Sequence, residues 1–247
     1  MNADPFAQLR LLDLQSLDSS LDRLAHRRRT LPELEQIAGL EERLAALRGE
    51  IVATETEDRD LGREQTKVET DVDGVRTRME RDQQRLDAGA VASPRELENL
   101  QSEIASLHRR QADLEDQVLE VMEQRESVQS RLSALVADRD RAQADMESAV
   151  ARRDAAYAEI EAESESVTKQ RADLAGSIPA DLLGLYDKIR ESAGGVGAAA
   201  LHRGRCEGCH LQLNTVDLNA LRDAPAQQVV RCEECRRILV RTAESGL

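Results

Sequence analysis

A seven-residue repeat of apolar side chains covers most of the first two thirds of the chain. From Leu40 to Leu86, steps of four and three residues alternate, and ten of the fourteen positions are Leu, Ile, Val or Met. A second register runs from Leu97 to Leu174. A disordered chain does not keep a 3.5-residue period over so many turns, so the repeat predicts a coiled coil.

Composition leaves disorder as the competing interpretation, because 33% of the residues are charged. The chain has two Tyr, one Phe and no Trp, so it lacks the bulky side chains of an ordinary globular core. An abundance of Ala, Leu, Glu and Arg is typical of long helices instead. The heptad repeat decides in favour of the coiled coil.

The two registers are separated by a short segment with turn and capping signals. Gly89 suits the left-handed conformation that ends a helix. Ser93, Pro94 and Glu96 form the N-cap, first-turn proline and capping box of the next helix. Helices joined by a short turn lie antiparallel, so we expect a hairpin with its turn at about 88–94. The hairpin covers its own apolar stripe, so dimerisation is allowed but not required.

A second break divides the first arm. Thr30, Pro32 and Glu33 form another capping signature, which predicts a separate, kinked helix over residues 5–29. We expect its apolar side chains to pack on the C-terminal end of the returning helix; they are Leu14, Leu17, Leu21 and Leu24.

Several polar residues occupy the apolar seam of the returning arm. We interpret them as residues that set the register while their charged ends reach water, and a functional cavity between the helices is the alternative. They are Gln111, Arg125, Arg139 and Arg153.

Gly176 and Pro179 mark the end of the long helix and the start of a short one, which Gly194 ends near residue 192. We therefore divide the chain into a kinked hairpin (1–176), a short linking helix (177–195) and a C-terminal module (196–247). The predicted fold class is mainly α: a long antiparallel coiled-coil hairpin plus a small C-terminal β zinc ribbon.

The zinc prediction rests on two pairs of cysteines, Cys206 with Cys209 and Cys232 with Cys235. Two residues between cysteines allow a tight turn to direct both sulfurs at one ion, and Zn²⁺ prefers four such ligands in a tetrahedron. We expect one structural Zn²⁺, flanked by strands at 196–201, 228–231 and 238–241 that form a small antiparallel ribbon. A helical turn is expected to begin at Asn214.

No part of the sequence suggests catalysis. Four thiolates would close the zinc shell, whereas catalytic zinc keeps one position open. His202 and His210 lie near the cysteines, and we expect them to be surface or supporting groups. The chain has no phosphate-binding or dinucleotide-binding motif. We expect a binding protein with neither enzyme activity nor a small-molecule substrate.

Charge is unevenly distributed along the chain. The net charge is −14, yet residues 201–247 hold seven Arg against six acids. Arginines that could contact phosphates therefore concentrate in the ribbon. The interspersed acids and the missing aromatic platforms favour the alternative of an ordinary solvated surface.

The sequence also predicts a cytoplasmic location. The first ten residues lack the apolar core of a signal peptide and include Asp4, and no run of about 18 apolar residues could span a membrane. Clustered cysteines in such a chain favour metal over disulfides.

With these features together, the chain resembles the bacterial family of C4-type zinc-ribbon proteins with an N-terminal coiled-coil hairpin, which includes a flagellar-biogenesis regulator and a chlamydial relative. The resemblance covers essentially the whole chain. It rests on residues 93–104 at the hairpin turn, on Ile178-Pro179 with Leu185-Tyr186, and on the two cysteine pairs with Arg236-Arg237-Ile238-Leu239.

The resemblance implies a regulatory or adaptor protein linked to transcription, because family members are associated with binding an alternative sigma factor and messenger RNA. It implies RNA or DNA contact through basic ribbon residues, for which the candidates are Arg203, Arg205, Arg231, Arg236 and Arg237.

The hairpin tip is uncharged and has small side chains, which suits contact with an as yet unidentified protein; the candidates there are Val91, Pro94 and Arg95. A pure protein–protein adaptor or chaperone, without nucleic-acid binding, is the alternative function. Regulators that enter the secondary channel of RNA polymerase share the architecture, but they act through acidic residues at the hairpin tip.

Overall fold

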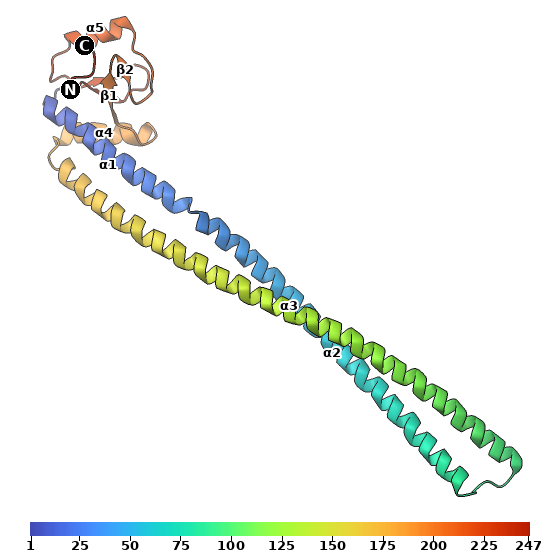
Figure 1. Cartoon of the computed structure of the whole chain (residues 1–247). Coiled ribbons are helices and arrows are strands. Elements are labelled where there is room, and N and C mark those ends of the chain that lie inside the picture. Colours follow the sequence, from blue (N-terminus) through green and yellow to red (C-terminus); the bar gives the residue numbers. More distant parts are fainter. The chain divides into compact units, whose positions relative to one another are not determined.

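A computed structural model describes residues 1–247 (Figure 1). Four helices come first: α1 (Pro5–Arg29), α2 (Pro32–Asp87), α3 (Pro94–Ala175) and α4 (Ala180–Ser192). The C-terminal part contains β1 (Ala198–His202), β2 (Arg205–Cys206), α5 (Thr215–Asp223), β3 (Val230–Arg231) and β4 (Ile238–Val240). The predicted fold class, a mainly α chain with a coiled-coil hairpin and a small β zinc ribbon, is confirmed. No helix, not even the 82-residue α3, has the apolar stretch needed to cross a lipid bilayer.

The chain forms two compact units, residues 36–149 and residues 1–35 with 150–247. In the first unit, α2 and α3 pack along the predicted apolar seam. Leu44, Leu47 and Ala142 form one buried cluster, against which Leu40, Leu135 and Met146 pack. Burial of these narrow stripes against each other stabilises the helices, because a long helix with one apolar face is not stable alone in water.

The hairpin turn lies between Asp87 and Pro94, and Gly89 has a φ of 63°. The Glu96 N–H donates to Ser93 Oγ at 3.3 Å, as expected for an N-cap. The Glu96 carboxylate accepts from the Ala92 N–H at 2.9 Å, one residue before the position expected of a capping box.

Of the four polar seam residues, Arg125 pairs across the hairpin, whereas Gln111, Arg139 and Arg153 bond to acids of α3 itself. Arg125 Nε donates to Asp58 Oδ1 at 3.1 Å, and its Nη1 donates to Gln65 Oε1 at 3.2 Å. Hydrogen bonds from Gln129 and Arg125 lower the pKa of Asp58. Gly62 leaves room for the guanidinium, which lies 3.4 Å from where a Cβ would be. The pairing of Arg125 with Asp58 and Gln65 fits the prediction of a register-setting residue.

In the second unit, α1 packs on the returning helix, as we expected, and also on elements that we did not predict as partners. Leu24 packs on Ile160 of α3, as predicted. Leu14 and its neighbour Leu11 are fully buried in a cluster that combines α4, strands β1 and β4, and Leu174 and Ala175 at the end of the returning helix. The chain reverses after α3, and this brings α4 beside the first half of α1 (Figure 1).

The sheet has the strand order β2-β1-β4-β3. Its two hairpin pairs are antiparallel, but β1 and β4 run parallel, so the expected all-antiparallel ribbon is wrong in this respect. A parallel pair requires a long crossover, and the segment that contains α5 provides it. The start of the chain also joins the ribbon: Ala3 N–H donates to Gln227 O at 2.7 Å, and Val229 N–H donates to Met1 O at 3.1 Å.

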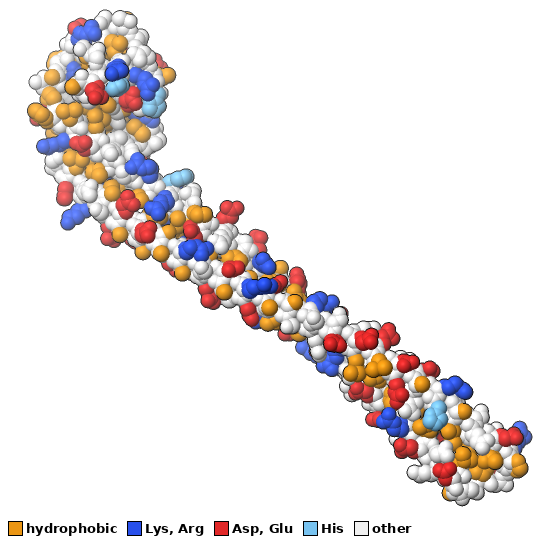
Figure 2. Space-filling model, in the orientation of Figure 1, with side chains coloured by type: hydrophobic (Ala, Val, Ile, Leu, Met, Phe, Trp, Pro, Cys, Tyr) orange, Lys and Arg blue, Asp and Glu red, His pale blue; other side chains and the backbone are white.

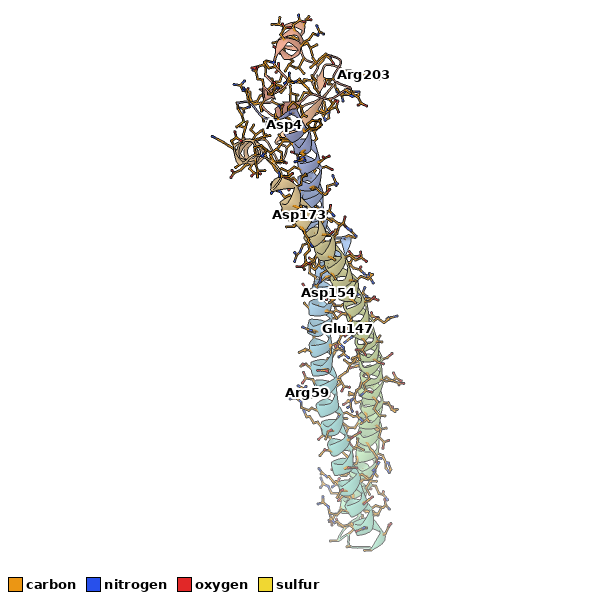
Figure 3. The ribbon with its side chains drawn as sticks, turned by 90° about the vertical axis from the view of Figure 1, so that its left-hand side faces the viewer. Asp4, Arg59, Glu147, Asp154, Asp173 and Arg203 are labelled. Carbon is orange, nitrogen blue, oxygen red and sulfur yellow. The ribbon has the colours of Figure 1, made fainter.

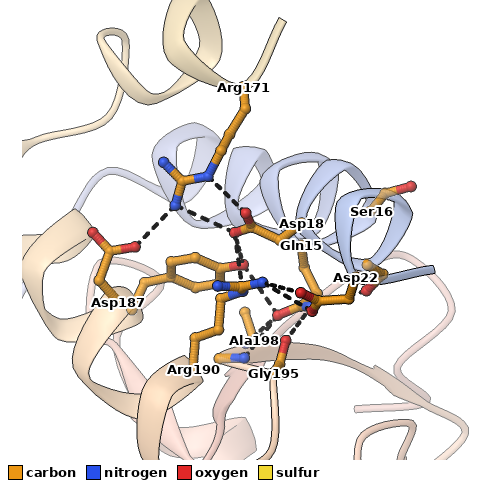
Figure 4. Close-up of polar contacts among 12 residues, drawn as sticks. Gln15, Ser16, Asp18, Asp22, Arg171, Asp187, Arg190, Gly195 and Ala198 are labelled. Carbon is orange, nitrogen blue, oxygen red and sulfur yellow. Dashed lines mark hydrogen bonds and ion pairs between the residues drawn. The ribbon is translucent and has the colours of Figure 1, made fainter. Parts of the chain in front are cut away.

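A buried polar network joins α1, α3, α4 and β1 (Figure 4). Asp18 is 1% exposed and accepts from Tyr186 Oη at 2.7 Å and from Arg171 Nε at 2.6 Å. Burial, followed by the hydrogen bond to Asp18, raises the pKa of Tyr186. Gln15 Oε1 accepts from the Gly197 N–H at 2.7 Å, and a Cβ on Gly197 would lie 2.7 Å from the Tyr186 ring. Only glycine therefore fits at this approach of the ribbon to α4.

We predict that Asp18→Ala lowers the free energy of unfolding by about 3 kcal/mol, near the lower end of the range for breaking buried ion pairs. The loss is limited because the Arg171 and Arg190 side chains remain 27% and 26% exposed to water. Urea unfolding would measure it, with Asp13→Ala on the exposed face of α1 as the matched control, expected within about 0.5 kcal/mol of wild type. Equal stability of the two variants would contradict the prediction.

Candidate metal centre

The two cysteine pairs lie in two turns of the same shape. The residue after each pair donates its N–H to the carbonyl of the first cysteine: His210 to Cys206 at 2.7 Å, and Arg236 to Cys232 at 2.9 Å. Both residues adopt positive φ, 61° and 62°. Each turn thus points its two sulfurs toward the other turn.

The four sulfur atoms converge on one point. The Sγ atoms of Cys206, Cys209, Cys232 and Cys235 all lie within 4.8 Å of one another. Cys206 Sγ is 3.8 Å from that of Cys235, and Cys209 Sγ is 3.9 Å from that of Cys232. Zinc–sulfur bonds of about 2.3 Å in a tetrahedron place the sulfurs about 3.8 Å apart. The geometry and the soft donor set both fit one Zn²⁺.

The site is partly shielded from water. Cys206 and Cys232 are fully buried, whereas Cys209 and Cys235 are half-buried. Burial raises the pKa of the Cys206 thiol to about 12 and also raises that of Cys232. Four protein thiolates fill the coordination shell of zinc, so the ion has a structural role.

Neither nearby histidine belongs to the group of metal-ligating side chains. His202 Nδ1 lies 3.2 Å from a carboxylate oxygen of Glu244, and His210 is exposed beside Arg205.

Two ribbon arginines serve the fold. Arg237, which we predicted as a nucleic-acid contact, donates to the carbonyls of Val196, Gly208 and Ala193 at 2.7–3.1 Å. It thereby ties the first cysteine turn to the end of α4. Arg241 likewise donates to five carbonyls around the loop after α5. Sequence reasoning missed both roles, because Arg237 was counted among the surface charges and the carbonyl partners of both are distant in the chain.

The other candidate contact residues are exposed. Arg203 occupies the two-residue turn between β1 and β2 and is labelled in Figure 3. Arg205 Nε lies 3.2 Å from Glu207, and Arg231 Nε donates to the carbonyl of Arg236 at 2.8 Å. Arg203 and Arg205 line an open hollow of about 690 Å³ with His202, Glu207, Gln212 and Glu244.

Residues 14–194 match the CT398-like coiled coil hairpin domain, and residues 205–239 match the C4-type zinc ribbon domain. The chain belongs to the family that combines these two domains. The predicted resemblance, including its chlamydial member, is thereby confirmed, and the predicted zinc cofactor is supported by the C4 ribbon match and by the cysteine cluster.

Several relatives match over nearly the full length. An uncharacterized protein of Mycobacterium tuberculosis, found in two strains, is 35% identical over 98% of both chains. A solved structure from Mycobacterium smegmatis is 33% identical, with a TM-score of 0.84 over 98% of this chain and 100% of that one. CT398 from Chlamydia trachomatis, 20% identical with a TM-score of 0.68 over 96% and 98% of the two chains, shares the fold.

We predict one zinc ion per wild-type chain and its loss in Cys232→Ser, because three thiolates no longer complete the shell. Loss of zinc should also abolish the cooperative unfolding of the ribbon, since metal binding supplies much of the folding energy of so small a module. Elemental analysis and thermal unfolding would measure both. The double variant His202→Ala/His210→Ala is the control and should keep its zinc; loss of zinc there would mean that a histidine is a ligand.

Proposed function

We propose that this protein is a zinc-binding regulator or adaptor, without enzyme activity, which contacts RNA or DNA through its ribbon and a protein through the tip of its hairpin. The four-thiolate shell supports binding over catalysis, because it leaves no coordination position for a substrate. Cysteines arranged for a metal rather than for disulfides support a cytoplasmic location.

Backbone strain in the ribbon is the observation that carries the nucleic-acid proposal. Three residues other than glycine have positive φ, and all lie in the ribbon: Arg203 (48°), His210 (61°) and Arg236 (62°). A side chain at such a position costs about 1–2 kcal/mol, and glycine would avoid that cost. Two arginines and a histidine stand there instead. The presence of these side chains, at a cost that glycine would avoid, favours a function for the side chains themselves.

The position of Arg203 in a tight turn gives further support to a contact role for its side chain. Arg203 and Gly204 form the two-residue connection between β1 and β2, and both have positive φ. Such turns favour Asn, Asp or Gly at the first position. Arginine has no local benefit there, but its guanidinium stands at the apex of the turn, where it can reach a phosphate. Glu207 and Glu244 line the same hollow, so we expect modest, salt-sensitive affinity.

Substitution by glycine can distinguish a nucleic-acid contact of these arginines from a structural role. In Arg203→Gly/Arg236→Gly, we expect the free energy of unfolding to stay constant or rise by about 1 kcal/mol, because strain is relieved. Affinity for a single-stranded 20-nucleotide RNA or DNA should fall about tenfold. The slope of log affinity against log salt should flatten by about 1.4, or 0.7 for each lost phosphate contact.

The control for this experiment is Arg63→Gly/Arg110→Gly, which removes the same charge from the outer faces of α2 and α3. Affinity should change little there, although glycine costs those helices about 1 kcal/mol each. Unchanged binding and slope in the ribbon variant would rule out these arginines as contacts, and absence of binding by wild type at low salt would leave the pure adaptor function.

The protein contact is proposed at the hairpin tip. Residues 88–93 carry no charge, Pro94 and Arg95 are exposed, and Leu97 is 39% exposed. An uncovered apolar side chain beside a turn of small residues suits a protein surface more than a nucleic acid.

We predict that a photo-crosslinking residue at position 91, in place of half-buried Val91, gives one adduct of discrete mass in cells. The same residue at position 63, where the Arg63 side chain is 70% exposed, should give none. Equal crosslinking from both positions, or none from position 91, would argue against the tip as the contact.

A further inference from the structure

Arginines concentrate where α1 ends, in the same unit as the ribbon. Residues 23–29 contain four arginines and no acid, and residues 150–160 of α3 contain two arginines and two acids. The balance of +4 stands out in a chain of net charge −14. On the face shown in Figure 2, by contrast, Lys and Arg side chains are mixed with Asp and Glu along the helices.

These two segments form one surface. Leu24 and Ile160 are buried against each other, which places the last turn of α1 beside α3. Arg27 Nη2 lies 3.8 Å from a carboxylate oxygen of Glu159, and Arg28, Arg29 and Arg152 are exposed. Cations at the C-terminal end of a helix interact favourably with its dipole, which accounts for the arginines of α1. The dipole does not account for Arg152 and Arg153, which lie within α3.

An aromatic ring lies among these arginines. The Arg28 guanidinium lies 5.1 Å from the centroid of the Tyr157 ring, and that of Arg153 lies 5.9 Å from it. Tyr186, the other tyrosine, is fully buried, and Phe6 stands exposed on α1. Tyr157 is thus the aromatic residue held among cations, and aromatic rings and guanidinium planes are the surfaces on which unpaired bases stack.

We propose that this junction cluster is a second contact site for single-stranded nucleic acid, with arginines on phosphates and bases stacked on the Tyr157 and Arg28 planes. The cluster consists of Arg27, Arg28, Arg29, Arg152, Arg153 and Tyr157. The proposal rests on nucleic-acid binding by the ribbon and extends it to a two-site contact. Gln8, which bonds to the ribbon at Ala226, lies 20 residues from Arg28, about 30 Å along α1. A strand of 20 nucleotides can reach both sites, since nine stacked bases already span about 30 Å.

The whole 247-residue chain, loaded with zinc, would be titrated with a 20-nucleotide RNA, the same DNA sequence, and poly-glutamate, each at several salt concentrations. In Arg28→Gln/Arg29→Gln/Arg152→Gln, we expect affinity for both nucleic acids to fall at least tenfold and the salt slope to flatten by about 1.4, for the phosphate contacts of Arg29 and Arg152 at 0.7 each. Arg63→Gln/Arg81→Gln/Arg110→Gln removes three exposed charges from the other unit and should change neither the affinity nor the salt slope.

Two variants of Tyr157 test base stacking. Tyr157→Phe should bind as wild type, and Tyr157→Leu, which keeps the apolar packing, should bind several-fold more weakly.

Each result has a distinct meaning. If the junction variant binds like its control while the ribbon glycine variant loses affinity, the junction cluster is not a contact and the proposed function stands. If wild type binds no nucleic acid at low salt, both proposals fail, and binding of poly-glutamate would then assign the cluster to an acidic protein. A preference for RNA over DNA would indicate recognition of the 2′-hydroxyl. Thermal unfolding would be measured for every variant. An unfolding temperature equal to that of the wild type would show that a change in affinity is not a folding defect.

Discussion

The fold of the zinc ribbon depends on the bonds between Zn²⁺ and its four thiolates, and the other elements of the same unit pack on the ribbon. These bonds fix two turns that are 22 residues apart in sequence; the first follows the β1–β2 hairpin, and the second connects β3 to β4. The sheet then places Ile238 and Val240 against Leu11 and Leu14 of α1. The remaining apolar cover of the first half of α1 comes from α4, from Ala198 of β1 and from Leu174 and Ala175 at the end of α3. Metal binding is therefore linked to the packing of a helix that contributes no ligand.

Prediction from sequence was accurate where one short-range rule decides the outcome. Heptad spacing depends only on helix geometry, and Cys206 to Cys235 follow a spacing that zinc chemistry imposes. The helix caps at Asn214 and Ser93 could also be predicted, because a capping residue bonds to a backbone N–H three residues away. The helix after Asn214 runs to Asp223, longer than the single turn expected.

Features that depend on distant segments could not be predicted. Three arginines of this chain have different environments: Arg125 pairs across the seam, Arg237 donates to backbone carbonyls, and Arg236 remains at the surface. Composition assigns all three the same charge. Only the register of the hairpin shows that Asp58 and Gln65, two apparent defects of the first heptad register, face Arg125. The parallel pairing of β1 and β4 also depends on the path of the long segment between them.

The attachment of the first residues to the ribbon has a consequence for biosynthesis. Ala3 bonds to Gln227, so 224 residues must be translated between the two partners. At about 5–20 residues per second, the ribosome needs about 10–45 s for that interval. Leu11 and Leu14 lack α4 until residue 192 has been made, and they lack β4 throughout the interval, because β4 is among the last elements made. The nascent chain therefore exposes an apolar helix face for far longer than a hairpin takes to form, which makes this helix a natural substrate for chaperones at the ribosome.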